Sequence, residues 1–110
     1  MKVKLAANRE WTSAGYPDAE RAILHLSAAQ GRTSIVRLKA GARGPMHSHE
    51  AGEHAFVVSG KVDISGQILG AGDYLYTEPG EKHALIALED SVLFASTERP
   101  IQVIEDANAA

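Results

Sequence analysis

Nine of the ten glycines fall between residues 31 and 80 and divide that part of the chain into short segments. The segments are about four to seven residues long and rich in Val, Ile, Leu, Tyr and Phe, which favours strands over helices. Short apolar segments bounded by turn residues are typical of β-sandwiches and barrels, so an all-β fold is predicted. The expected strands are Ala22–Leu26, Thr33–Leu38, Glu53–Ser59, Lys61–Ile64, Asp73–Thr77, His83–Leu88, Ser91–Ser96 and Ile101–Ile104.

Composition narrows the class of protein. A chain of 110 residues, 45% hydrophobic and 23% charged, is expected to form one globular domain. The net charge of −3 leaves no basic surface for nucleic acid or anionic lipid, so we expect neither as a partner. Because the chain has no cysteine, disulfides, thiolate metal ligands and cysteine nucleophiles are excluded.

The chain shows no targeting or membrane segment. Its first residues, MKVKLAANREW, lack the apolar stretch of a secretory signal. The longest apolar run, Ala84–Leu88, is far shorter than the ~20 residues of a membrane span. A cytoplasmic protein is therefore expected. Residues 1–110 are expected to form a single domain, with an N-terminal arm or strand over 1–19, a barrel over about 20–105 and a frayed tail over 106–110.

Histidines are the residues that most directly suggest chemistry. Four of the five lie between residues 47 and 83. On a strand, His47 and His49 point to the same face, and a turn containing Gly52 lets Glu53 begin the next strand nearby. Imidazoles suit Zn, Cu, Fe and Ni, and a carboxylate offsets part of the charge of a divalent ion. The alternative is a pair of surface histidines beside a loop.

Two segments resemble the sequence motifs of the cupins. The first has the glycine, histidine and glutamate spacing of the first cupin motif, in the order Gly41, His47, His49, Glu53 and Gly60. The second resembles the second motif through Gly72, Gly80 and His83. It departs from the pattern in two places, because Pro79 comes one position late and Ala87 replaces the expected asparagine. The 11 residues between the motifs, Lys61–Ala71, imply a tight hairpin around Ser65-Gly66-Gln67.

The chain is most similar to the cupins of the ChrR anti-sigma factors and the acetylacetone-cleaving dioxygenases. This closer likeness depends on Arg32–Gly41, His47–Glu53 and Asp73–Tyr76. The resemblance implies a cupin barrel, also called a double-stranded β-helix or jelly roll, and a homodimer. It also implies one divalent ion, of Fe, Mn, Ni, Zn, Co or Cu, and the ligand set is His47, His49, Glu53 and His83.

Three kinds of function fit such a site. The first is a metalloenzyme of dioxygenase or isomerase type acting on a small oxygen-bearing molecule, with Glu53 as a candidate proton acceptor. The second is a sensory or regulatory module that binds metal or a small molecule, and the third is a cupin with an incidental metal. Val57 has the same parity along its strand as Glu53, and Leu85 and Ala87 have the same parity as His83. These apolar residues are therefore expected on the same face as the ligands, which predicts a mainly apolar pocket.

Other residues have structural interpretations. His54 follows Glu53 on the same strand, so we expect it on the opposite face, away from the metal. Tyr74 and Tyr76 share a face and are expected to pack in the core or an interface. Trp11 is expected to pack across the barrel or against a partner. Glu78 is a candidate for contact with a metal ligand.

Overall fold

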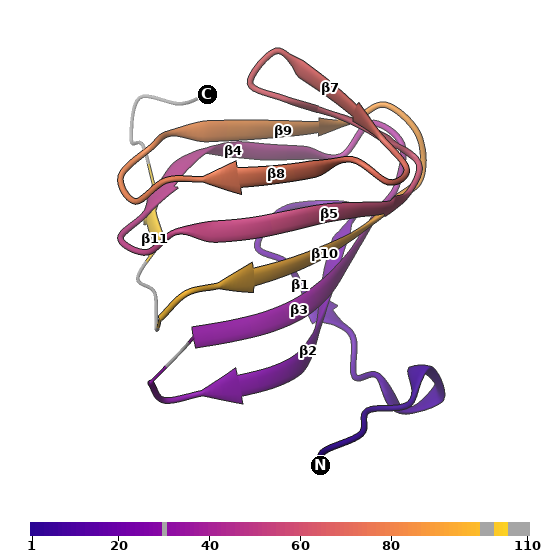
Figure 1. Cartoon of the computed structure of the whole chain (residues 1–110). Coiled ribbons are helices and arrows are strands. Elements are labelled where there is room, and N and C mark those ends of the chain that lie inside the picture. The colour runs from indigo at the N-terminus through magenta and orange to yellow at the C-terminus, as the bar shows by residue number, and fades with distance from the viewer. Residues whose placement is uncertain (30, 100–102, 106–110) are drawn as a thin grey trace.

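The protein is an all-β barrel made of two antiparallel sheets, as the sequence predicts (Figure 1). The computed structural model describes residues 1–29, 31–99 and 103–105. A 3-10 helix, η1 (Ala6–Asn8), precedes the strands. The six-stranded sheet has the order β1 (Thr12–Ser13), β2 (Ala19–Ser27), β3 (Gly31–Leu38), β10 (Ser91–Thr97), β5 (Glu53–Ser59) and β8 (Tyr74–Thr77). The five-stranded sheet has the order β11 (Val103–Glu105), β4 (Arg43–His49), β9 (His83–Ala87), β6 (Lys61–Ile64) and β7 (Gln67–Gly70).

Most strands lie where the sequence predicts them. β5 and β6 begin and end at the predicted residues. The predicted hairpin joins β6 to β7, and its two turn residues, Ser65 and Gly66, have φ angles of 48° and 91°. Positive φ at both positions is the pattern of a type I′ turn, whose twist matches that of a hairpin. The expected strand Ile101–Ile104 overlaps β11, but residues 101–102 and the expected tail 106–110 lie outside the described residues.

From β3 onward the chain passes back and forth between the two sheets, apart from the β6–β7 hairpin, and so encloses an interior. β4 lies in the five-stranded sheet, whereas β5, which follows it after three residues, lies in the six-stranded sheet. Side chains alternate in and out along each strand, so every second residue faces the space between the sheets. In β3, for example, Ser34, Val36 and Leu38 are buried on the inward face.

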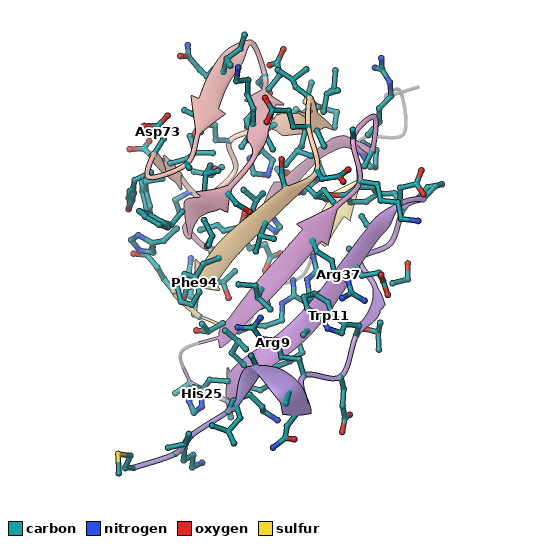
Figure 2. The ribbon with its side chains drawn as sticks, turned by 90° about the vertical axis from the view of Figure 1, so that its right-hand side faces the viewer. Arg9, Trp11, His25, Arg37, Asp73 and Phe94 are labelled. Carbon is teal, nitrogen blue, oxygen red and sulfur yellow. The ribbon has the colours of Figure 1, made fainter. Side chains whose placement is uncertain are left out.

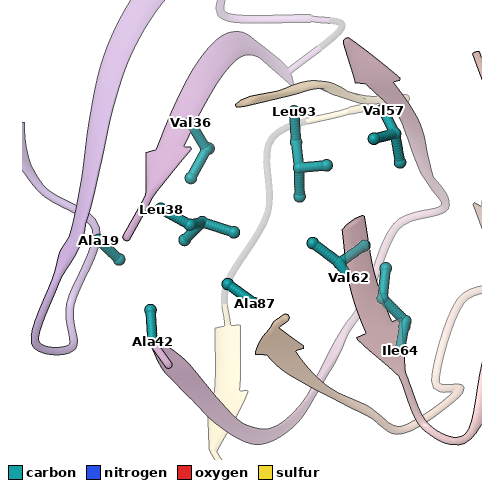
Figure 3. Close-up of a cluster of buried hydrophobic side chains, with 9 residues drawn as sticks. All are labelled: Ala19, Val36, Leu38, Ala42, Val57, Val62, Ile64, Ala87 and Leu93. Carbon is teal, nitrogen blue, oxygen red and sulfur yellow. The ribbon is translucent and has the colours of Figure 1, made fainter. Parts of the chain in front are cut away.

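An apolar core fills one end of this interior (Figure 3). Both sheets contribute to it, and Val57 and Val62 are its largest fully buried side chains. Full burial of a Val or Leu side chain contributes about 1.5–3 kcal/mol, so this end of the barrel holds the two sheets together. The cluster consists of Ala19, Val36, Leu38, Ala42, Val57, Val62, Ile64, Ala87 and Leu93.

The N-terminal segment lies against the outer side of the six-stranded sheet (Figure 2). The Arg37 guanidinium stacks 3.9 Å from the centre of the Trp11 ring, and Arg37 Nε donates to Glu20 Oε1 over 3.1 Å. Trp11 therefore packs on the outside of β3 and not across the barrel interior. In the described part of the chain, no helix is long and apolar enough to cross a membrane.

Candidate metal centre

His47 and His83 face each other across neighbouring strands because β4 contains a bulge. Arg43 pairs with Ile86 and Gly44 with Leu85, a register that would put His47 opposite residue 82. The register shifts between Gly44 and His47, so His47 pairs with His83 instead. One extra residue in a strand reverses which side chains face inward, and proline is tolerated at such sites. The segment that contains Pro45 thus turns both His47 and His49 toward the interior.

Hydrogen bonds orient the two facing rings. His47 Nδ1 donates to the Pro45 carbonyl over 2.8 Å, which leaves the lone pair on Nε2 in the neutral ring. His83 Nδ1 lies 3.1 Å from Thr77 Oγ1. The two Nε2 atoms are 3.0 Å apart. Both rings therefore hold Nε2 toward one shared point, the arrangement that backbone and hydroxyl partners give to metal-binding histidines.

His49 completes the histidine cluster from the next inward position of β4. Its side chain is buried, and among the described residues neither ring nitrogen has a hydrogen-bond partner. Burial, followed by the charges of His47, Arg32 and Arg21, lowers the pKa of His49 to about 4. Burial and then His47 also lower the pKa of His83, although Glu53 acts in the opposite direction. These effects favour the neutral imidazoles that a metal requires.

Glu53 reaches the cluster from the opposite sheet. Its Oε2 atom lies 3.6 Å from His49 Nε2, and its side chain lines the same cavity as the three histidines. Glu53 therefore faces the histidines across the interior, because β5 belongs to the six-stranded sheet and β4 and β9 to the other. A Cβ at Gly52 would collide with the ends of the Tyr76 and Glu98 side chains, so glycine leaves room for both side chains beside this connection.

The donor set fits a divalent metal ion. One nitrogen from each of His47, His49 and His83 lies within 4.8 Å of the others, the scale of one coordination sphere. Two nitrogen ligands about 2.1 Å from one ion and at right angles to each other lie about 3.0 Å apart. The observed Nε2 separation is also 3.0 Å. Buried polar atoms without partners are uncommon in proteins, so the unpartnered nitrogens of His49 also call for a ligand.

A cavity of about 250 Å³ adjoins this cluster. Leu75, Leu85 and Leu93 form apolar walls, in accord with the prediction for Leu85. The prediction for Val57 and Ala87 is wrong, because both belong to the packed core at the other end. The cavity is smaller than the ~300–1,000 Å³ typical of drug-sized ligand sites, so it suits a small molecule.

Three polar residues that line this cavity were not predicted from the sequence. Arg21 and Arg32 come from β2 and β3, and Tyr16 precedes β2. Strand alternation could have indicated that Arg32 faces the interior, since Arg32 has the same parity as Ser34 and Val36 on β3. Burial raises the pKa of Tyr16, so its phenol stays a neutral hydrogen-bond donor.

The remaining candidates lie outside the cavity. His54 is exposed on the outer face, as predicted, with Nδ1 2.6 Å from the Tyr74 hydroxyl. Tyr74 and Tyr76 are exposed beside it, and Tyr76 donates to Glu98 Oε1 over 2.8 Å. Glu78 is exposed, whereas its neighbour Thr77 is the residue that contacts His83.

Sequence comparison places the chain in a family. Residues 2–102 match the ChrR cupin-like domain family, so the protein belongs to this group of cupins. A DNA damage-repair/toleration protein of Arabidopsis thaliana is 33% identical over 97 residues. That match covers 82% of this chain but spans only 30% of the plant protein.

Solved structures with the same fold include enzymes and a regulator. An acetylacetone dioxygenase from Acinetobacter johnsonii has a TM-score of 0.81 at 20% identity, over 100% of this chain and 80% of its own. The anti-sigma ChrR of Rhodobacter sphaeroides, solved in complex with SigE, has a TM-score of 0.73 at 22% identity. The match covers 84% of this chain and 50% of the ChrR chain. An RmlC-like cupin from Shewanella frigidimarina has a TM-score of 0.77 at 20% identity, over 86% of each chain. At these identities the likeness shows the cupin fold.

Proposed function

We propose that the protein is a metalloenzyme that holds one divalent ion and acts on a small oxygen-bearing molecule. The observation that carries the proposal is the 3.0 Å approach of the Nε2 atoms of His47 and His83 beside the unpartnered nitrogens of His49. The proposed ligand set is these three histidines and Glu53. When bound, the ion supplies Lewis-acid polarisation of a substrate oxygen and, if it is redox-active, a route to dioxygen chemistry.

The chain's own residues would prepare the substrate. Leu75, Leu85 and Leu93 keep the cavity walls apolar, which strengthens polar interactions by excluding water. Neutral Tyr16 offers a phenol hydrogen to a substrate oxygen. Glu53 is the candidate proton acceptor, because its carboxylate lines the cavity beside His49.

The leading experiment combines metal analysis with oxygen uptake. Protein purified without an affinity metal is analysed for its elements and then assayed with small β-diketones and hydroxylated aromatics. We expect about one metal per chain, and iron or manganese would favour dioxygenase chemistry. His83→Ala should lose the metal, whereas His54→Ala, a change to the exposed histidine of β5, should keep it. Equal metal content in the two variants would contradict the proposed site.

A sensory or regulatory module is the second candidate. Its support is the match to the ChrR cupin-like family and the fold shared with an anti-sigma protein. Tightly held zinc without turnover of any tested substrate would favour it over the enzyme.

We also propose that the protein is a cytoplasmic homodimer. The outer face of the six-stranded sheet exposes the aromatic side chains of Phe56, Tyr74 and Phe94, which are 44%, 51% and 38% accessible. Sedimentation measurements on Phe56→Ser and Phe94→Ser variants would test whether this face contributes to association.

A further inference from the structure

Two arginines enter the cavity from the sheet opposite His47 and His83. Arg21 pairs in register with Val36, and Arg32 lies on the same face of β3 as Ser34 and Val36. All of these side chains line the cavity that contains the histidine cluster. β2 and β3 therefore hold two guanidinium groups at the wall that faces the histidine cluster.

Neither guanidinium has an acidic partner in the described part of the chain. The ion pairs found within 4.0 Å there involve Arg37, His49, His54 and Lys61, and neither Arg21 nor Arg32. Arg21 Nε is buried without a hydrogen-bond partner. An unsatisfied charged donor that is buried costs more free energy than a neutral one, so this arrangement calls for a ligand.

The two positive charges also repel each other. Burial, followed by the charge of Arg21, lowers the pKa of Arg32. Among the described residues that line the cavity, Glu53 is the single carboxylate, so with neutral histidines two guanidiniums and one carboxylate leave it with one net positive charge. A divalent ion would add two more. An anion relieves both the repulsion and the unsatisfied donors, and guanidinium groups match a carboxylate through paired hydrogen bonds.

We infer that the cavity takes a small carboxylate, bound by Arg21 and Arg32, with a neighbouring carbonyl or hydroxyl oxygen directed to the metal site. The inference deepens the proposed function and depends on it for the second contact. The carboxylate contact depends on the arginines alone. The 250 Å³ volume and the leucine walls limit the ligand to a compact molecule such as a short 2-oxo acid.

Pyruvate and its amide, pyruvamide, are matched probes, because they differ by the exchange of one charged oxygen for a neutral amino group. Isothermal titration calorimetry compares their affinities for zinc-loaded and metal-free protein, since the metal itself also favours an anion. We expect pyruvate to bind at least about 10-fold more tightly than pyruvamide to the loaded protein. Pyruvate should also bind more tightly than pyruvamide to the metal-free protein.

Substitutions assign this preference to the arginines. Arg32→Gln and Arg21→Gln, each made alone, should reduce the ratio of the two affinities to about threefold or less. Arg37→Gln is the control, because Arg37 lies on the same strand as Arg32 but on the outer face, where it contacts Trp11 and Glu20. Circular dichroism checks that each variant is folded. The comparison of the two probes on the wild-type protein tests the inference even if a variant fails to fold.

The outcomes separate this inference from the proposed function. Equal binding of the two probes by wild type, or a preference that neither arginine variant changes, would overturn the carboxylate site even if metal is present. Absence of metal together with a preference for pyruvate would contradict the metalloenzyme and support the arginine site.

Discussion

The two ends of the barrel interior are built by the same strands from opposite kinds of side chain. On β3, Leu38 packs in the apolar core, whereas Arg32, roughly 20 Å away along the strand, lines the cavity. On β9, Ala87 belongs to the core and His83 to the histidine cluster. The core end supplies burial, and the cavity end holds buried polar groups that have no hydrogen-bond partner among the described residues.

This division separates stability from chemistry within one small barrel. Buried polar groups without partners destabilise a fold, so the cavity end must be supported by the packing at the other end. Substitutions at the core end should therefore affect unfolding, and substitutions at the cavity end should affect ligand binding.

The largest expected effect is at the core end. Leu38→Ala removes a side chain that is 3% exposed and should lower the free energy of unfolding by about 2–5 kcal/mol. Urea unfolding of the metal-free protein measures the loss. Metal stoichiometry of the folded variant should stay at the wild-type value. A variant that unfolds like wild type, or that is folded but fails to bind metal, would break the separation of the two ends.

Acid should weaken the fold through the cavity end. The pKa of His49 is about 4 in the folded protein and about 6.5 when unfolded, so only the unfolded chain takes up the proton between these values. Above pH 6.5 the neutral His49 makes its full contribution to the stability of the metal-free protein. That contribution is lost progressively as the pH falls from 6.5 toward 4. The loss attributable to His49 should be of the order of 3 kcal/mol at most.

Unfolding midpoints measured from pH 7.5 to 4 test this prediction. His49→Gln should flatten the pH dependence, whereas His54→Gln, at an exposed position, should preserve it. The same slope in both variants would show that acid acts elsewhere in the protein.

The smallest expected effect concerns the hydroxyl that orients His83. Thr77→Val keeps the shape of the side chain but removes the contact with His83 Nδ1. Loss of such a contact should weaken zinc affinity by about 10-fold, with little change in the stability of the metal-free protein. Competition with a chromogenic chelator measures the affinity. Ser48→Ala, another small polar change in a buried strand position near the site, serves as a comparison.

Sequence alone predicted the all-β cupin fold, several strand limits and the three histidines that the structure brings together. These features are local, because strand periodicity, turn glycines, the spacing of His47 and His49, and the cupin-like motif that contains His83 can each be read from a short segment. Even Glu53, whose role as a ligand remains a proposal, was selected from its distance along the chain to His49.

Tertiary structure decided how these residues meet. The bulge in β4 depends on its pairing with β9, about 40 residues away, and it puts His47 opposite His83. The placement of Glu53 on the opposite sheet depends on where the chain crosses between the sheets. Arg21 and Arg32 belong to no motif in the sequence, and they reach the cavity because β2 and β3 curve around it. Contacts between distant segments follow from register and sheet closure, which no short stretch of sequence encodes.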